Sequence, residues 1–269
     1  MVDTVVIMSV YFRDDKDEFE RALSSMLNQT VEVDVFLYCD GELNFELESV
    51  VESYRCHKSV TIFKNRLNKG LSFGLNYLID KALEGGYQFI ARMDSDDWSY
   101  PHRIERQRSY FNDNSNVDVC GTFCKEVGAS YALSRKELPT SHGDLYRFSV
   151  LRCPFIHPTV LFRRKVFESG IRYPIDTHLT EDMALWFFLL AKGFKFGNVD
   201  EVLLDYTLRE ATILRRSGVK KGISEFVERY RFMVETRQAS VKNIFGVTSR
   251  LFFHLLPPKL LKFLYRKAR

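Results

Sequence analysis

Residues 88–97 read QFIARMDSDD, an apolar run that ends in three carboxylates within four positions. The run from Gln88 to Met93 predicts a buried strand. The acids that follow repel one another unless a cation or hydrogen-bond donors compensate. Asp94 and Asp96 alternate, so both can face one pocket, and their oxygens suit Mg²⁺ or Mn²⁺. We therefore predict a strand that ends at a divalent-metal site.

Two other interpretations of these acids were weighed against the metal site. An EF-hand loop is excluded, because Trp98 and Ser99 occupy the positions where an oxygen ligand and a glycine are needed. An acidic loop or helix cap stays open, with Asp97 capping a helix that begins near Pro101.

The sequence before this motif alternates between strand and helix patterns. That alternation predicts parallel βαβ crossovers and an open sheet with helices on both faces. Ligands in such sheets bind beyond the carboxyl ends of the strands, where Tyr11, Asp40, 66–68 and 94–97 fall. The predicted strands are Thr4–Val10, Val31–Cys39 and Val60–Phe63, and the predicted helices are Asp14–Leu27 and Asn68–Leu83.

The second half of the chain has less regular patterns. They predict strands over Pro154–Phe162 and Val199–Thr207 and helices over Thr180–Lys192 and Ser224–Lys242. The chain then closes on an apolar and basic stretch, SRLFFHLLPPKLLKFLYRKAR, over 249–269.

Composition indicates a globular protein with one large α/β domain and room for an appendage. The 269 residues are 45% hydrophobic and 28% charged. The net charge is +4, yet residues 238–269 hold seven basic residues and no acid, so the positive charge belongs to the tail. The absence of a GxGxxG fingerprint and of a P-loop disfavours NAD and kinase-type ATP binding.

Several features indicate a cytosolic protein. The amino terminus has no basic segment ahead of its apolar stretch, which disfavours a signal peptide. The longest apolar run, Met183–Ala191, is too short to span a membrane. The five cysteines are scattered without a zinc-ligand pattern, which predicts buried thiols in a reducing compartment.

A series of short segments, taken in order, resembles the inverting glycosyltransferases of family 2. It is especially similar to bacterial enzymes that build O-antigen and exopolysaccharide repeat units, of the amylovoran-biosynthesis type. The segments are SVYF (9–12), NQT (28–30), CDG (39–41), NKGLSFGLN (68–76), RMDSDD (92–97), PHRIERQ (101–107), HPTVLFRR (157–164) and TEDMALW (180–186).

The resemblance implies an α/β fold called GT-A, with a mixed, mostly parallel central sheet, helices on both faces and a C-terminal helical extension. A catalytic domain would span 1–215, with a nucleotide-binding half over 1–110 and an acceptor-binding half over 111–215. Residues 216–269 would form a basic helical segment that associates with a membrane.

The resemblance also implies roles for individual residues. Asp96, together with Asp94, would bind Mn²⁺ or Mg²⁺. Two alternatives stay open: Asn68 only starts its helix, and Asp40-Gly41 is only a turn. The donor nucleotide sugar would contact Ser9, Val10, Tyr11, Asp40, Asn68, Lys69, Asp94 and Ser95.

The acids Glu181 and Asp182 supply the general base in the resembling family, usually through the aspartate. We expect Asp182 to remove the proton from the attacking hydroxyl and Glu181 to have a structural or acceptor-binding role. Acids also favour the first turn of a helix, and we expect this pair to start one as well.

Three further features keep two interpretations each. His157 either faces the sugars or is structural. Arg209 and the basic stretch 215–221 either close over the diphosphate or form a solvated loop. The tail either meets anionic lipid headgroups or packs as a helix pair on the body.

The sequence therefore predicts an enzyme that moves a hexose, galactose or glucose, from a UDP-sugar to a lipid-linked saccharide in O-antigen or capsule synthesis. It would work in the cytoplasm at the inner face of the cell membrane, without nucleic acid as a partner. The family's processive members carry a QxxRW motif and several spanning helices, and neither is present, so we expect one or a few sugars to be added. A nucleotidyltransferase and a non-catalytic membrane adaptor are the alternatives.

Overall fold

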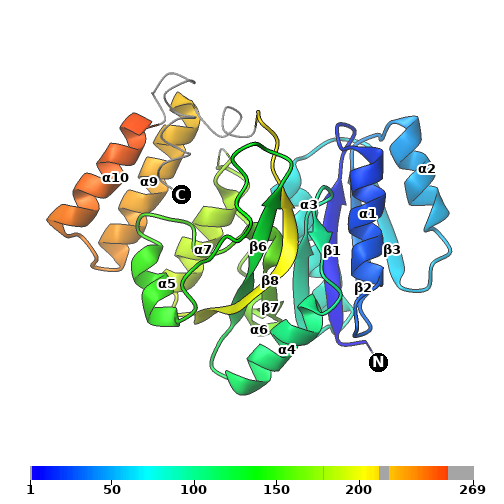
Figure 1. Cartoon of the computed structure of the whole chain (residues 1–269), viewed down its shortest axis with the longest axis horizontal. Coiled ribbons are helices and arrows are strands. Elements are labelled where there is room, and N and C mark those ends of the chain that lie inside the picture. The colour runs from blue at the N-terminus through cyan, green and yellow to red at the C-terminus, as the bar shows by residue number, and fades with distance from the viewer. Residues whose placement is uncertain (1, 178, 212–217, 254–269) are drawn as a thin grey trace.

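The computed structural model, which describes residues 2–177, 179–211 and 218–253, is built on one eight-stranded sheet (Figure 1). The strand order is β3-β2-β1-β4-β7-β6-β8-β5. The strands are β1 (Thr4–Val10), β2 (Asp34–Asp40), β3 (Val60–Asn65), β4 (Phe89–Met93), β5 (Trp98–Ser99), β6 (Val119–Val127), β7 (Leu161–Arg163) and β8 (Phe196–Thr207).

Helices cover both faces of this sheet and extend it at the C-terminal side (Figure 1). The predicted α/β architecture is therefore confirmed. The helices are α1 (Lys16–Leu27), α2 (Phe45–Ser53), α3 (Leu71–Glu84), α4 (Arg103–Asp113), α5 (His142–Phe148), the 3-10 turn η1 (His157–Thr159), α6 (Lys165–Glu168), α7 (Glu181–Ala191), α9 (Val219–Glu235) and α10 (Val241–Phe253).

Strand β1 shows why its sequence is apolar at nearly every position. Successive side chains of a strand point to opposite faces. Val6 and Met8 pack with α1, α2 and α4, whereas Val5 and Ile7 pack with α3 and α7. A central strand with two buried faces needs apolar residues on both of them.

The sheet is parallel in the half that the first 93 residues build. Strands β3, β2, β1 and β4 run in the same direction, so their carboxyl ends meet at one edge. Beyond β4 the short strand β7 runs antiparallel and joins β4 to β6. The sheet is thus mixed and mostly parallel, as predicted.

Element boundaries in the first half lie close to the prediction. Asp15 caps α1, because its carboxylate accepts hydrogen bonds from two backbone N–H groups, and the helix begins at Lys16. Helix α3 begins at Leu71, and its N-cap is Gly70 with φ of +89°. Asn68 therefore does not start this helix, and that interpretation is wrong.

The second half departs further from the prediction. The strand expected over 154–162 is instead the turn η1 followed by the three residues of β7. Helix α7 lies within one residue of its prediction at each end, and β8 begins three residues early, at Phe196. The single helix expected over 224–242 is two helices, α9 and α10, separated at Arg237, which has φ of +55°.

Helices α9 and α10 pack on the body as a pair. Arg229 is buried and donates hydrogen bonds to the carbonyls of Ser149 and Val150 at 3.1 and 3.0 Å. Glu225 accepts from both Arg229 and Arg250, which ties α10 to α9. This arrangement agrees with a packed helix pair up to residue 253, and the rest of the tail, 254–269, lies outside the described residues.

No helix within the described part of the chain has both the length and the apolar character to cross a membrane. The cysteines differ in exposure: Cys39, Cys120 and Cys124 are buried and Cys153 is half-buried. Cys56 is exposed and lies between α2 and β3, at the sheet edge opposite the carboxyl ends. The expectation of buried thiols thus fails at Cys56.

Candidate active site

The site forms where the parallel strands β1, β2 and β4 end. Strand β1 pairs with β2 through Val10 and Cys39, and with β4 through Met8 and Met93. The segments that follow these strands therefore begin side by side at one edge of the sheet. Every donor-site or metal-site residue predicted in the first hundred positions lies on these segments, at the strand ends or on the β3–α3 loop.

Asp40 joins the end of β2 to the loop that leads into α3. Its buried carboxylate accepts hydrogen bonds from the backbone N–H groups of Lys69 at 2.7 Å and Gly70 at 2.9 Å. The Asn68 amide donates to the Asp40 carbonyl at 3.2 Å. Gly41 is in the left-handed region, with φ of +90°, and a Cβ there would lie 3.1–3.2 Å from Asn68. Asp40-Gly41 is therefore a turn and also an anchor for the loop.

The other residues predicted to bind the donor differ in which of their groups are accessible to a ligand. The side chain of Val10 is buried in the core, so only its backbone can face a ligand. Ser9 and Tyr11 are half-buried at the end of β1. Lys69 is exposed, with its ammonium 4.4 Å from the ring centre of Phe73.

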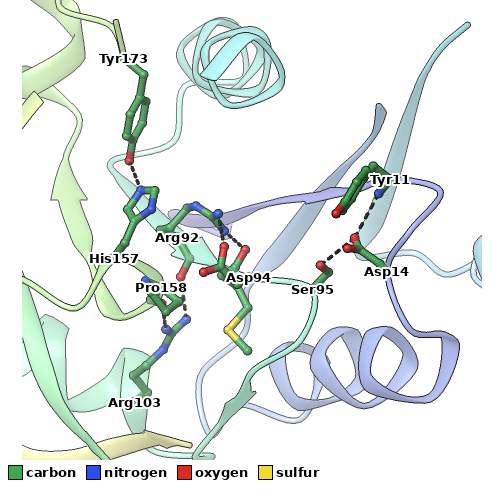
Figure 2. Close-up of polar contacts among 10 residues, drawn as sticks. Tyr11, Asp14, Arg92, Asp94, Ser95, Arg103, His157, Pro158 and Tyr173 are labelled. Carbon is green, nitrogen blue, oxygen red and sulfur yellow. Dashed lines mark hydrogen bonds and ion pairs between the residues drawn. The ribbon is translucent and has the colours of Figure 1, made fainter. Parts of the chain in front are cut away.

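Asp14 belongs to the site although it is not among the site residues predicted from the sequence. Its Oδ2 accepts from the backbone N–H of Tyr11 at 3.1 Å and from the Ser95 hydroxyl at 2.8 Å (Figure 2). Burial raises the pKa of Asp14 to about 6, and the charge of Asp94 adds to this rise. Ser95 thus acts as a link between two loops. A partner 81 positions away leaves no local signal in the sequence.

The carboxylates of Asp94, Asp96 and Asp97 gather at the end of β4. One oxygen from each lies within 4.8 Å of the others. Burial raises the pKa of Asp96, and the nearby charges of Asp94 and Asp14 raise it further. Such a group is costly by itself, and a bound cation would stabilise it.

Asp97 is the most buried member of this cluster. Its Oδ1 accepts from the backbone N–H of Thr207 at 2.7 Å, whereas Oδ2 is buried and has no hydrogen-bond partner among the described residues. Helix α4 begins after His102, so Asp97 does not cap it and that interpretation is wrong. An unsatisfied carboxylate oxygen beside Asp94 and Asp96 fits a hard divalent ion.

Two buried arginines lie behind the cluster. Arg92 forms an ion pair with Asp94 (Figure 2). Arg103 donates to the carbonyl of Arg92 at 3.2 Å and to that of Pro158, and burial lowers its pKa to about 9. These guanidinium groups offset part of the negative charge and fix the β4 end against η1.

His157 and Tyr173 form the next layer beside Arg92 (Figure 2). Nε2 of His157 lies 2.9 Å from the hydroxyl of the buried Tyr173. Burial raises the pKa of Tyr173. The charges of Asp182 and Asp94, one from each acidic group, raise it further. His157 is thus a bonded neighbour of the site rather than an isolated side chain.

Glu181 and Asp182 form the first turn of α7, as predicted. Burial raises the pKa of Glu181, and the charge of Asp182 adds to the rise. Asp182 accepts from the backbone N–H of Met183 at 2.7 Å. The preceding Thr180 shares a hydrogen bond of 2.8 Å with Ser224 of α9.

Charge interactions connect this pair to the cluster at β4. Arg92, the partner of Asp94, lowers the pKa of Glu181, and so does Lys221 of α9. Arg209 forms an ion pair with Glu18, and its positive charge lowers the pKa values of Asp14 and Asp96. The two predicted acidic groups therefore share one region. Within the basic stretch 215–221, positions 215–217 lie outside the described residues, so closure over a diphosphate stays a prediction.

Comparisons with known proteins agree with this geometry. A family model described as "Glycosyl transferase family 2" matches residues 5–171, more than half of the chain. The chain is 30% identical to UDP-Gal:alpha-D-GlcNAc-diphosphoundecaprenol beta-1,3-galactosyltransferase of Escherichia coli, over 98% of this chain and 95% of that protein. It is 28% identical to the amylovoran biosynthesis glycosyltransferase AmsE of Erwinia amylovora, over 98% of each.

Two solved structures share the fold. TarS of S. aureus superposes on 94% of this chain with a TM-score of 0.65 and 15% identity, and the chain spans 43% of the length of that structure. The mannosyltransferase PcManGT of Pyrobaculum calidifontis, solved with GDP-Man and Mn²⁺, superposes on 99% of this chain and 79% of its own, with a TM-score of 0.63 and 13% identity. The predicted GT-A fold is thereby confirmed.

Proposed function

This chain belongs to glycosyl transferase family 2, and we propose that it transfers a hexose from a UDP-sugar to a lipid-linked saccharide during bacterial surface polysaccharide synthesis. Family membership makes it a glycosyltransferase, not a nucleotidyltransferase or an adaptor. One observation carries the proposal: Arg92 forms an ion pair with Asp94 of the acidic cluster at β4 and also lowers the pKa of Glu181 in the acidic pair at α7, so the two acidic groups share a neighbour.

The donor half of the proposal rests on Asp40 and the acidic cluster. Asp40 holds the loop of Asn68 and Lys69 against the end of β2, and its carboxylate oxygens keep lone pairs for a uracil N–H. Asp94 would reach the ribose beside Ser95, and the half-buried Tyr11 would line the nucleoside pocket. The division into a donor half over 1–110 and an acceptor half over 111–215 follows from this assignment.

Asp96 and Asp94 would hold Mn²⁺ or Mg²⁺, with Asp97 as a third oxygen source. When bound, the ion supplies positive charge opposite the diphosphate as it leaves. PcManGT was solved with Mn²⁺, which supports this choice of ion. The protein contributes Arg92, which holds Asp94 in place through their ion pair.

Asp182 would act as the general base. It takes the proton of the acceptor hydroxyl while that oxygen forms a bond to the anomeric carbon and the bond to the diphosphate oxygen breaks. A single in-line displacement of this kind inverts the anomeric centre. Glu181, whose pKa is raised by burial, would position the acceptor through hydrogen bonds.

The acceptor class and the location follow from the relative in Escherichia coli, whose name describes a galactosyltransferase acting on a sugar attached to diphosphoundecaprenol. We propose the same class of acceptor and galactose as the first sugar to test, with glucose second. A lipid-linked acceptor places the enzyme at the inner face of the cell membrane, where the basic tail would meet anionic lipid.

The test is a donor screen with the purified full-length protein. Hydrolysis of UDP- and GDP-sugars is followed in the presence of Mn²⁺ and after its removal with EDTA. We expect UDP-galactose or UDP-glucose to be cleaved, with a strict metal requirement, and galactose to be transferred to a synthetic GlcNAc-diphospholipid. Cleavage of GDP-sugars alone, or activity unchanged by EDTA, would contradict the proposal.

A further inference from the structure

Exposed apolar side chains concentrate on the C-terminal helix pair. Among the described residues fifteen large apolar side chains are exposed, and eight of them lie on α9 and α10. These helices hold only 17 and 13 residues. We call these eight side chains the hairpin face: Val219, Ile223, Val227, Tyr230, Val234, Val241, Ile244 and Phe245.

Helix α9 is apolar on two separate sides. Its buried side, which includes Phe232 and Met233, packs on α7 and the rest of the body. Its hairpin-face residues run from 219 to 234 at intervals of three or four, which places them on one stripe of the helix. The body already covers the buried side, so this stripe is a second apolar surface that nothing in the described chain covers.

Helix α10 lies beside α9 (Figure 1) and carries the other three side chains of the hairpin face. Val241 and Phe245 are 86% and 75% exposed, one turn apart at the start of the helix. The chain reaches Val241 only seven residues after Val234, the last member of the α9 stripe. Apolar side chains gathered in this way on the surface of a protein mark an interaction surface.

The charges of the helix pair indicate the chemistry of its partner. Residues 218–253 contain seven basic and three acidic side chains. Of the three acids, Glu225 is buried between Arg229 and Arg250, Glu228 pairs with Arg231, and Glu235 is exposed at the end of α9. Exposed cations therefore flank the hairpin face, among them Lys220, Arg237 and Lys242. A second copy would bring like charges together, whereas an anionic surface complements them.

We propose that the hairpin face docks on an anionic lipid bilayer, with its apolar side chains at the boundary of headgroups and acyl chains and its cations at the lipid phosphates. The hairpin face begins near Asp182, the candidate base. Ser224 of α9 shares a hydrogen bond with Thr180, and the charge of Lys221 lowers the pKa of Glu181. A lipid-linked acceptor would thus meet the site at the membrane. Only this last step rests on the proposed function.

The experiment is vesicle flotation of the full-length protein. Vesicles of phosphatidylcholine alone are compared with vesicles that also contain phosphatidylglycerol. The test variant carries Ile223→Glu and Tyr230→Glu, both at exposed positions, and the matched control carries Phe45→Glu on α2, where Phe45 is 88% exposed. A third variant, Lys259→Gln with Lys262→Gln, tests the tail separately.

We expect the wild type and the Phe45→Glu control to float with the anionic vesicles, and the test variant to partition about tenfold more weakly. An unchanged far-UV circular dichroism spectrum and melting temperature show that the test variant is folded. The proposal is overturned if the wild type does not bind anionic vesicles, or if only the tail variant loses binding. The proposal is also overturned if the wild type is a dimer and the test variant is a monomer, because the hairpin face would then join two copies of the chain. Flotation needs no turnover, so a failed donor screen leaves this result intact.

Discussion

The hydroxyl of Ser95 donates a hydrogen bond of 2.8 Å to Oδ2 of Asp14, and the backbone N–H of Tyr11 donates to the same oxygen. This carboxylate joins the segment after β1 to the acidic segment after β4. Both segments are predicted to contact the donor, so Asp14 sets their spacing without needing to touch the ligand.

Replacing Asp14 by Ala should therefore loosen both segments. Two part-buried donors, the Tyr11 N–H and the Ser95 hydroxyl, lose their acceptor, which costs about 1 kcal/mol of the free energy of unfolding. We expect urea denaturation to show this loss and titration calorimetry to show weaker UDP binding. Asp17→Ala, at an exposed position of α1, is the control and should change neither quantity.

Asp96→Ala should abolish metal-dependent turnover. Losing the charge stabilisation supplied by a bound divalent ion is worth about 4 kcal/mol in the transition state, a factor of roughly 1000 in kcat. Initial rates measured across a Mn²⁺ titration check this expectation. If Asp96→Ala and the wild type have equal rates at every Mn²⁺ concentration in the titration, Asp96 does not belong to the metal site.

Asp182→Asn should separate donor binding from transfer. The variant keeps the shape of the side chain but cannot accept the acceptor's proton, so transfer should fall by about 10²–10⁴-fold. The Kd for UDP should stay unchanged, because Asp182 lies on α7 and is assigned to the acceptor hydroxyl and not to the nucleotide. Glu181→Gln should mainly raise KM for the acceptor. If kcat falls further in Glu181→Gln than in Asp182→Asn, then Glu181 is the general base and Asp182 positions the acceptor.

Asp40→Asn should weaken UDP binding. The carboxylate accepts from two N–H groups, those of Lys69 and Gly70, and an amide offers one oxygen and one opposing NH₂ group. We expect Kd to rise about tenfold, which is ~1.4 kcal/mol. Glu42→Gln, two positions along and exposed, serves as the control in the same calorimetric titration.

Glu181 should make stability depend on pH. Burial and Asp182 raise its folded pKa above the ordinary 4.5, in spite of Arg92 and Lys221. As pH rises from 4.5 to the folded pKa, the unfolded state loses its proton first, so stability falls across that window and stays lower above it. Glu181→Gln has no proton to lose and should melt at a higher temperature than the wild type at about pH 8.

The same melting curves should converge at about pH 4, where the glutamate is protonated in both states. Glu46→Gln, at an exposed position of α2, should melt like the wild type at both pH values. A stabilising effect of Glu181→Gln that persists unchanged at low pH would show that packing, and not ionisation, is responsible.

The parallel half of the sheet could be predicted because its strands carry a strong local signal. Strand β1 is apolar on both faces, and β4 runs directly into Asp94, so periodicity and the acidic motif indicate the same edge. The acids of α7 were likewise found at their positions, since first-turn acids and the apolar run after them mark a helix start.

The features that could not be predicted from the sequence depend on contacts between distant residues or on elements too short to show a pattern. Asp14 is held by Ser95, 81 positions away, and Arg103 is held by the carbonyls of Arg92 and Pro158, and neither contact leaves a periodic pattern. Strand β7 has three residues, too few for alternation to appear. The break between α9 and α10 falls at Arg237, which adopts a positive φ without being a glycine.

The position of Cys56 has a practical consequence. Its thiol is exposed at the edge of the sheet away from the candidate site, and burial raises the pKa of the half-buried Cys153. A maleimide dye should therefore attach to the natural protein at one place, with no engineered cysteine. Such a label would report, by fluorescence, how the molecule is oriented when it arrives at a vesicle.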